Sequence, residues 1–423
     1  MTMLFRPLLA AAAFLSTPLF AAENWPEFRG PAGDGHTDAT GLPVTFGDTD
    51  HVKWKTAIHG KAWSSPVIWG SQVWLSTANE EGTELSVLTL DKDSGKILRD
   101  DILFHVAAPQ FCHQFNSYAS STPAIEEGRI YVTFGSPGTA CLDTRTGKKI
   151  WERTDFVCNH FRGAGSSPII WKDLLIMNFD GSDNQFIVAL DKATGKSVWE
   201  TKRSVDFNDV GPDGKVKNEG DYRKAFATPH VYLQDGQPIL LSSGAKAHYA
   251  YDPRTGKELW RFDEPEAQSA ATRPVIGFGM AYIPAGFGKA GLLAIKLGGH
   301  GQLSANDLAW RMKKAAPNKP SVTLVGDLLF TVNDGGIATC VEAKTGNVLW
   351  SERLGGNFSA SPIYSEGRLY AGNEEGKFYV FEAGREFKVL AQNQFPDGFM
   401  ASPAVSGKAL YLRSKTTLYR IEN

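Results

Sequence analysis

The stretch DKATGKSVW, residues 191–199, decides the fold, because near-copies of it recur along the chain. Within this copy, Asp191 and Thr194 can hydrogen-bond to the local backbone, and Gly195 can adopt a positive φ angle. The phrase therefore predicts a tight turn between two strands, with Trp199 anchoring the second strand. Further copies begin at Asp91, Asp143, Asp252, Glu342 and Glu382, and one with an expanded turn ends at Trp310.

A second marker repeats in parallel with the turn phrase. It consists of two mostly small residues, a proline, and then β-branched or apolar residues. Its prolines are Pro66, Pro123, Pro168, Pro229, Pro274, Pro320, Pro362 and Pro403, spaced 41 to 61 residues apart. A period near 45 residues with four strand-like runs per unit is typical of a β-propeller. We therefore expect an all-β fold, an eight-bladed propeller of four-stranded antiparallel blades.

One repeat shows the expected blade. The runs SPIIWK, LLIMNF, FIVALD and KSVWETK, between residues 167 and 202, would be its four strands from the axis to the rim. Proline can start the inner strand, where the loss of one N–H donor matters little. The small residues beside it fit because eight inner strands crowd around one axis. Both markers are interpreted as specifying the fold, not as binding a ligand.

The last repeat lacks one strand. Only three strand-like runs remain around and after Pro403, whereas HVKWKTAI, residues 51–58, has the pattern of the missing one. We expect the strand around Trp54 to pair with the strand around Leu418, which would leave no open sheet edge. The predicted organisation is a signal peptide at 1–22, an extended segment at 23–50 and a single propeller at 51–423.

The first 22 residues have the pattern of a secretory signal peptide. Arg6 precedes an apolar run at residues 8–20, and two alanines follow. An uncleaved anchor is the alternative, for which the run is short. No cysteine lies near this boundary, so the chain is not expected to be a lipoprotein. The sequence thus predicts a periplasmic or secreted protein with no later membrane span. A net charge of −2 gives no reason to expect a nucleic-acid partner.

The repeat resembles the PQQ-like β-propeller, whose blades carry a D-x-x-T-G-x-x-x-W phrase, over nearly the whole mature chain. Three stretches look like an exported bacterial subfamily of PQQ-binding-like repeat proteins without an assigned function: NWPEFRGPAGDG (24–35), CNHFRGAGSSP (158–168) and RLGGNFSASP (353–362). More distant relatives are the quinoprotein alcohol dehydrogenases and the propeller lipoprotein of the outer-membrane barrel assembly machinery. The resemblance implies the fold more strongly than any activity.

The resemblance to the dehydrogenases weakens at the residues that carry their chemistry. Those enzymes share a pair of adjacent cysteines over the quinone, whereas Cys112, Cys141, Cys158 and Cys340 are nowhere adjacent. No calcium-binding Glu/Asn/Asp set can be matched, and no C-x-x-C-H haem motif is present. PQQ and Ca²⁺ are therefore weakly supported cofactors, and a PQQ-dependent dehydrogenase is disfavoured. The turn DGSDNQ (180–185) offers oxygen ligands, but its spacing favours an ordinary polar turn, so no metal site is predicted.

The candidate site lies where the connections enter the inner strands, since these share one face of a propeller, called the top face here. Three connections are long: 105–122, 155–167 and 204–228. Long loops on a rigid scaffold commonly carry binding residues. We expect a single depression at the mouth of the channel, lined by the ligand-binding residues Lys61, His113, Tyr118, Asn159, His160, Arg162, Lys224 and Arg273. Such clustered cations would favour an anionic ligand, unless each has a local partner on a solvated rim.

The leading interpretation is a monomeric binding or scaffold protein whose basic top-face pocket takes an anionic or carbohydrate ligand. The partner would be an anionic small molecule, a polysaccharide or another envelope protein. The alternative is a polysaccharide lyase using the same pocket. A cation would then neutralise a uronate carboxylate, and His113, Tyr118 or His160 would be the catalytic base. Convergence of these groups within about 6 Å would favour the enzyme.

The cysteines give two further expectations. Cys112 and Cys158 occupy matching places in adjacent connections, so a disulfide between them is plausible in an exported protein. Cys141 and Cys340 fall in opposite blades of an eight-fold ring and are expected to be buried free thiols.

Overall fold

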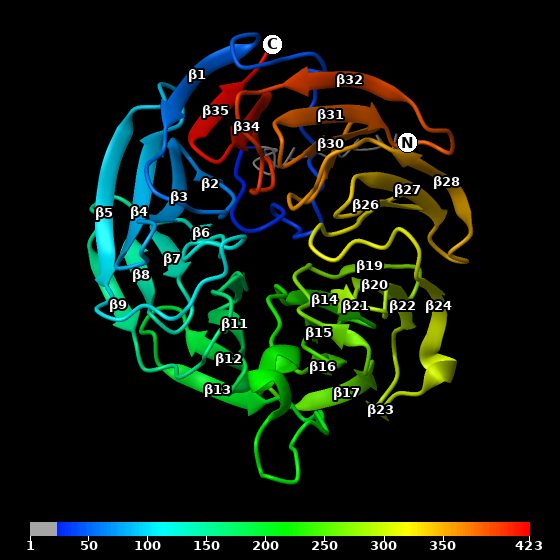
Figure 1. Cartoon of the computed structure of the whole chain (residues 1–423). Coiled ribbons are helices and arrows are strands. Elements are labelled where there is room, and N and C mark those ends of the chain that lie inside the picture. The colour runs from blue at the N-terminus through cyan, green and yellow to red at the C-terminus, as the bar shows by residue number, and fades with distance from the viewer. Residues whose placement is uncertain (1–22) are drawn as a thin grey trace, which may run out of the picture.

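The computed structural model describes residues 23–423 and shows eight antiparallel sheets arranged as blades around a central axis (Figure 1). The expected eight-bladed, all-β propeller is confirmed. The predicted signal peptide, residues 1–22, lies outside the described residues. Within the described part of the chain, no helix is long and apolar enough to cross a membrane.

The blades are numbered in chain order, with the strands of blades 1 to 7 given from the axis outward. Blade 1 is β2 (Val67–Trp69), β3 (Gln72–Ala78), β4 (Glu84–Asp91) and β5 (Ile97–His105). Blade 2 is β6 (Ala124–Glu126), β7 (Arg129–Thr133), β8 (Thr139–Asp143) and β9 (Lys149–Arg153). Blade 3 is β10 (Ile169–Trp171), β11 (Leu174–Asp180), β12 (Gln185–Asp191) and β13 (Ser197–Lys202). Blade 4 is β14 (His230–Gln234), β15 (Gln237–Ser243), β16 (Ala247–Tyr251) and β17 (Glu258–Asp263), extended by β23 (Gly301–Gln302).

The second half of the ring follows the same plan. Blade 5 is β19 (Val275–Gly277), β20 (Met280–Pro284), β22 (Leu292–Lys296) and β24 (Leu308–Met312). Blade 6 is β25 (Thr323–Val325), β26 (Leu328–Val332), β27 (Ile337–Glu342) and β28 (Val348–Arg353). Blade 7 is β29 (Ile363–Ser365), β30 (Arg368–Gly372), β31 (Lys377–Glu382) and β32 (Val389–Gln394). Blade 8 is β33 (Ala404–Ser406), β34 (Ala409–Arg413), β35 (Thr417–Ile421) and β1 (Val52–Ala57). The short elements outside the blades are β18 (Ala267–Gln268), β21 (Phe287–Gly288) and the 3₁₀ helices η1 (Lys217–Arg223) and η2 (Ala305–Asp307).

The recurring turn phrase shapes a turn and also docks the neighbouring blade. Oδ1 of Asp191 accepts hydrogen bonds from the amide and hydroxyl of Thr194, at 2.8 and 2.7 Å. Gly195 has a φ of 74°, and an added Cβ would lie 2.6 Å from a ring atom of Trp151 in the preceding blade. Nε1 of Trp151 donates to the carbonyl of Lys192 at 3.0 Å. The same Nε1-to-carbonyl bond recurs at Trp54, Trp199, Trp310 and Trp350.

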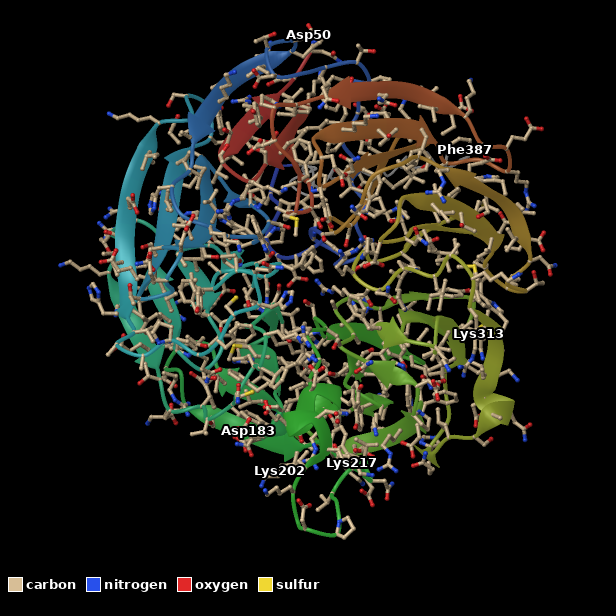
Figure 2. The ribbon with its side chains drawn as sticks, viewed as in Figure 1. Asp50, Asp183, Lys202, Lys217, Lys313 and Phe387 are labelled. Atoms are coloured by element: carbon tan, nitrogen blue, oxygen red, sulfur yellow. The ribbon has the colours of Figure 1, made fainter. Side chains whose placement is uncertain are left out.

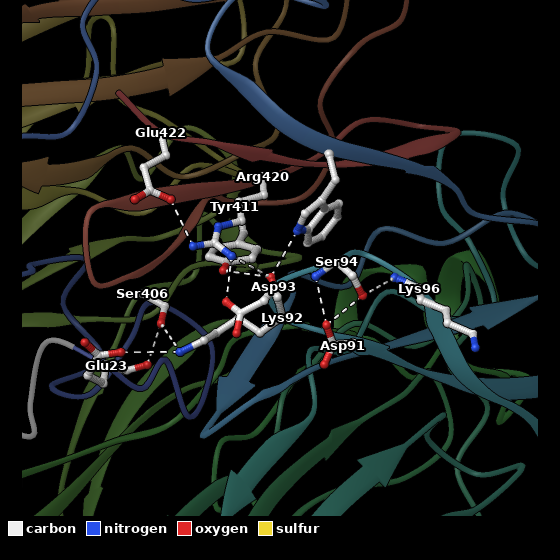
Figure 3. A network of polar contacts seen from close by, with 11 residues as sticks. Glu23, Asp91, Lys92, Asp93, Ser94, Lys96, Ser406, Tyr411, Arg420 and Glu422 are labelled. Carbon is white, nitrogen blue, oxygen red and sulfur yellow. Dashed lines mark hydrogen bonds and ion pairs between the residues drawn. The ribbon is translucent and has the colours of Figure 1, made fainter.

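Strand β1 closes the ring, as the sequence predicts. It pairs antiparallel with β35, with Trp54 opposite Arg420 and Thr56 opposite Leu418. Figure 1 shows the blue strand β1 beside the red strand β35. The seam between blades 8 and 1 carries further polar contacts (Figure 3), in which Arg420 donates to the Lys92 carbonyl at 3.1 Å and to Asp93 at 2.8 Å. First and last blades are therefore joined by side chains as well as by the strand.

The segment before β1 crosses the channel. It pairs with blade 1 through Trp25 and Ile68, and Arg29 donates to the carbonyl of Val322, just before blade 6, at 2.8 Å. It then follows blade 7, where Phe46 donates its amide to Asn393 at 2.9 Å. In Figure 1 this segment is the dark blue trace near the centre of the ring. The stretch that the sequence suggested only as extended thus spans the central channel.

Candidate functional site

A cavity of about 700 Å³ opens at the top of the channel. Its wall includes five aromatic side chains, namely Phe28, Trp63, Phe115, Phe226 and Phe287. Three cations and one carboxylate also line it, namely Arg162, Lys224, Lys319 and Asp221. The cavity is thus a mixed aromatic and cationic site.

Three long connections form one continuous wall of this cavity. The Asn116 amide of the first connection donates to the carbonyls of Arg162 and Ala164 in the second, at 3.0 and 3.2 Å. The Arg162 guanidinium in turn contacts both carboxylate oxygens of Asp221 in the third, at 3.2 and 3.3 Å. The third connection contains η1, whose first residue, Lys217, is labelled near the bottom of Figure 2. The expected clustering of these three inserts is therefore found.

Each cation of the cavity has a local acidic partner. Arg162 and Lys224 share Asp221, and Lys319 contacts Glu374 at 3.1 Å. Desolvation lowers the pKa of Lys224, which is only 3% exposed. Burial opposes ionisation of Asp221, but hydrogen bonds from Lys224 and Arg162 leave its pKa below the usual value. Lys319 also contacts Asp334 at 3.5 Å, so the three cations face three carboxylates and the cavity carries no formal excess of positive charge.

Three of the eight predicted site residues, His113, Arg162 and Lys224, line this cavity. The others lie elsewhere, so the expectation of a single depression lined by all eight is wrong. Lys61 donates to the Gln114 carbonyl at 2.7 Å, close to the rim. Asn159 donates its amide to Asp183 on a neighbouring exposed turn.

Arg273 is directed into the channel and not toward the top face. It is 3% exposed, pairs with Glu27 at 2.8 Å and donates to the carbonyl of Phe28 at 2.8 Å. Its partners belong to the segment that crosses the channel, which the sequence analysis did not place there. Arg273 is therefore a structural partner of that segment.

The three candidate bases do not converge. His113 lines the main cavity, whereas Tyr118 and His160 line a separate void of about 20 Å³. Nε2 of His160 accepts the Ser136 amide at 3.0 Å, and desolvation lowers the pKa of this histidine to about 4. The Tyr118 hydroxyl donates to the Gln110 carbonyl at 3.1 Å. Of the three candidate bases, only His113 therefore shares a cavity with the cations Arg162 and Lys224.

Sequence reasoning missed a ring of hydroxyl groups around the axis. In seven of the eight blades, the residue two positions before the inner strand accepts, through its hydroxyl, the backbone N–H of the equivalent residue in the preceding blade, at 2.9 to 3.3 Å. In blade 5 this position is Arg273, which has no hydroxyl. In blade 6 it is Ser321, because β25 starts at Thr323, so Pro320 does not immediately precede an inner strand as the repeat marker suggested. The hydroxyl ring consists of Ser65, Thr122, Ser167, Thr228, Ser321, Ser361 and Ser402.

All four cysteines are free thiols, so the expected Cys112–Cys158 disulfide is not formed. Sγ of Cys112 faces the Arg162 carbonyl at 3.7 Å, whereas Sγ of Cys158 faces the Asn184 carbonyl at 3.8 Å. The two sulfur atoms are thus aimed at different loops. Cys141 and Cys340 are buried free thiols, as predicted.

The residues at the cavity do not fit a calcium-bound quinone. Asp221 is already engaged by two cations, and the thiols are not adjacent. In the turn 180–185, Asp180 pairs with Arg203 at 2.7 Å, and Asp183 accepts two backbone amides. Across residues 23–423, no group of three or more His, Cys, Asp or Glu side chains has a metal-binding arrangement.

A protein-family model matches most of the chain. The family model described as outer membrane protein assembly factor BamB matches residues 39–154, 73–222, 179–303 and 301–386, which together cover most of the sequence. The chain belongs to this family. The resemblance to PQQ-like propellers drawn from the repeat phrase is confirmed.

The chain is also similar in sequence to quinoprotein dehydrogenases. The chain is 30% identical to a quinoprotein ethanol dehydrogenase of Pseudomonas aeruginosa, over 33% of this chain and 22% of the enzyme. It is 25% identical to the quinohemoprotein alcohol dehydrogenase ADH-IIG of Pseudomonas putida, over 54% of this chain and 32% of the enzyme. The matches thus span about a fifth to a third of the enzymes' length.

Solved structures agree on the fold. BamB from Moraxella catarrhalis superposes with a TM-score of 0.57 at 15% identity, covering 88% of this chain and 99% of the other. The quinohemoprotein alcohol dehydrogenase of Comamonas testosteroni gives 0.62 at 12% identity, covering 95% and 80%. At such identities the likeness concerns the propeller alone.

Proposed function

We propose that this BamB-family propeller is a binding or scaffold protein whose top-face cavity takes an acidic oligosaccharide. The observation that carries the proposal is the combination of aromatic walls and cations in one cavity of about 700 Å³. Binding pockets are commonly lined by apolar and aromatic side chains with a few oriented polar groups. Aromatic faces can pack against sugar rings, while the cations attract carboxylates.

Two cations are well placed for this role. Nζ of Lys319 lies 4.1 Å from the centre of the Phe115 ring, so charge and aromatic surface are adjacent. Arg162 is 40% exposed at its side chain and can meet a ligand without losing Asp221. Charge at a concave mouth also raises the local concentration of an anionic ligand.

A binding role is favoured over catalysis because two of the three candidate bases, Tyr118 and His160, lie outside the main cavity. His160 is 7% exposed and already accepts a backbone hydrogen bond, so it has no access to a sugar in the main cavity. Function outside the cytoplasm is part of the proposal, supported by the pattern of residues 1–22 and by the name of the matching family.

A protein partner is the second candidate. The long connections of the top face expose Phe111 and Val157, at 66% and 70%. Interaction surfaces commonly carry exposed apolar area that is contiguous. The name of the matching assembly-factor family agrees with a scaffold role.

The test is a thermal-shift and calorimetric titration of residues 23–423 with oligogalacturonate, a neutral oligosaccharide of equal length, and PQQ. Oligogalacturonate is expected to raise the melting temperature and the neutral sugar to have little effect. Arg162→Ala should weaken binding with little change in melting temperature, since exposed ion pairs contribute at most about 1 kcal/mol. The weakening should be larger at low salt, where screening is least. Equal response to both sugars, or to PQQ alone, would refute the proposal.

A further inference from the structure

We propose that the floor of the cavity is an oxyanion seat on the propeller axis, formed by six members of the hydroxyl ring. This inference rests on the proposed function and adds how the ligand is oriented. The six hydroxyls that line the cavity come from six different blades: Ser65, Thr122, Ser167, Thr228, Ser361 and Ser402.

The protons of these six hydroxyls have no acceptor in the protein. Each oxygen accepts a backbone N–H from the neighbouring blade, and none of the six donates a hydrogen bond to any group in residues 23–423. The six side chains are only 1 to 4% exposed. A hydroxyl carries one proton and two lone pairs, and a buried donor without an acceptor is unfavourable. Because each hydroxyl oxygen already accepts a backbone N–H, its own proton can be donated to a ligand in the cavity.

Other hydroxyls of the same cavity show the contrast. Ser120 donates to Oδ1 of Asn116 at 2.6 Å, and Ser359 donates to Oε1 of Glu374 at 2.7 Å. Both line the cavity, yet both have an acceptor side chain of their own. The ring hydroxyls differ because their neighbours around the axis are other hydroxyls and backbone amides.

A buried hydroxyl that can donate into the cavity matches a group that has several lone pairs and no protons. A carboxylate, sulfate or phosphate meets this requirement, whereas a neutral sugar hydroxyl brings a proton of its own. A buried arginine also lies in the segment that crosses the channel. Arg29 is 1% exposed in the segment that crosses the channel, and all its hydrogen bonds go to carbonyl or hydroxyl oxygens.

The oxyanion seat and the aromatic wall together orient the ligand in the cavity. Phe28 of the crossing segment lines the cavity, and Trp63 and Phe115 stand in the connections that precede the inner strands. An acidic oligosaccharide therefore enters with a terminal oxyanion toward the axis, and its sugar rings lie against the aromatic wall.

Two serines of the hydroxyl ring, Ser167 and Ser321, make equivalent backbone hydrogen bonds and therefore provide a test variant and its control. Ser167 accepts the Thr122 amide, and Ser321 accepts the Arg273 amide, both at 3.0 Å. Ser167 lines the cavity, whereas Ser321 belongs to the same ring but does not. Ser167→Ala and Ser321→Ala should therefore lose similar stability. Only Ser167→Ala should weaken binding, by about tenfold or more, the loss expected for a hydrogen bond to a charged group.

The experiment titrates residues 23–423 by calorimetry with sodium sulfate, sodium phosphate, oligogalacturonate and its neutral counterpart at constant ionic strength. The titrations with sulfate and phosphate test whether the oxyanion seat binds an anion by itself. The titrations with the two oligosaccharides test whether the seat binds an anionic group that is attached to a sugar. Thr228→Val, which removes a ring hydroxyl at nearly constant volume, is the second variant should Ser167→Ala not fold. The inference predicts weaker oligogalacturonate binding in either variant and unchanged binding in Ser321→Ala.

Two outcomes separate this inference from the proposed function. Wild-type affinity in Ser167→Ala and Thr228→Val, together with weak binding in Arg162→Ala, would overturn the seat and leave the acidic-oligosaccharide site intact. Failure of the wild-type protein to bind oligogalacturonate would refute the proposed function. If sulfate still bound in a manner dependent on Ser167, the seat would stand for a different oxyanion ligand.

Discussion

The environment of each histidine, more than its position in the sequence, decides what it can do. His160 lies in a polar insert and is a predicted candidate base, yet it is buried and its Nε2 accepts the Ser136 amide. Desolvation lowers its pKa to about 4, and also lowers that of His230 and His248 to about 3. These side chains are held neutral in the fold.

The buried state of His160 predicts how stability depends on pH. Because its folded-state pKa lies below the unfolded value, protonation favours the unfolded chain, and stability is lost as pH falls from about 6.5 toward 4. This histidine alone should account for about 1–2 kcal/mol of the free energy of unfolding lost between pH 7 and pH 5. Urea unfolding of His160→Asn should show a flatter pH dependence by that amount. The exposed variant His51→Asn is the control, and an equal slope in all three proteins would contradict the assignment.

At the scale of the element, the turn phrase joins neighbouring blades. The ring of Trp151 covers Gly195 of the next blade, and similar packing pairs Trp54 with Gly95 and Trp310 with Gly346. The phrase recurs because each copy forms both a turn and an interface. Blade 1 ends without a tryptophan, and there Arg99 donates to the Arg145 carbonyl at 2.9 Å instead.

Gly195→Ala should be clearly more destabilising than Gly214→Ala. Both glycines have φ near 75°, but an added Cβ meets Trp151 at 2.6 Å in the first case and nothing within 4 Å in the second. The cost of placing alanine at a positive φ is the same in both variants. The difference between their free energies of unfolding therefore measures packing against the indole and should be about 1–3 kcal/mol. Chemical denaturation of the two variants and the wild type checks this. Equal losses of unfolding free energy would mean that the Trp151 ring can move aside without destabilising the fold.

Short-range chemistry explains which elements could be predicted from sequence. The turn phrase and the strand runs are local, so the eight blades and the closing strand were predicted. The orientation of Arg273 was not, because its partner Glu27 lies far away in the chain. The role of Ser167 was also missed. Its hydroxyl accepts a hydrogen bond from a backbone amide of another blade, whereas the sequence alone suggests only that a small residue is needed there. Both of these side chains take their orientation from partners that are distant in the sequence.

At the scale of the whole molecule, the two ends of the chain hold the ring together. Strand β1 covers the edge of β35, and the crossing segment contacts blades 1, 5, 6 and 7 through residues such as Trp25, Glu27 and Arg29. Removal of residues 23–57 would expose the edge of β35 and leave the buried Arg273 without its carboxylate. An unpaired edge and an unpaired buried charge are both strongly unfavourable.

The variant 58–423 should therefore associate into oligomers or aggregate, whereas residues 23–423 should stay monomeric. Light scattering after size-exclusion chromatography measures this directly. Adding a synthetic peptide of residues 23–57 should restore the monomer, and a scrambled peptide should not. A stable monomer of 58–423 with the melting temperature of the longer chain would show that the ring does not need its N-terminal strand.

Because β1 and β35 are far apart in the sequence, a growing polypeptide can complete blade 8 only after blades 1 to 7 have been synthesised. During synthesis, blades 1 to 7 can form from local hairpins, whereas β1 has no partner until β35 has been synthesised. Pairing between distant segments carries a high loop-closure entropy and slows folding. The closing step should therefore limit the rate of folding, and amides of blade 8 should exchange with solvent by partial opening more readily than those of the continuous blades. The seam that makes the ring complete is also where it is expected to open first.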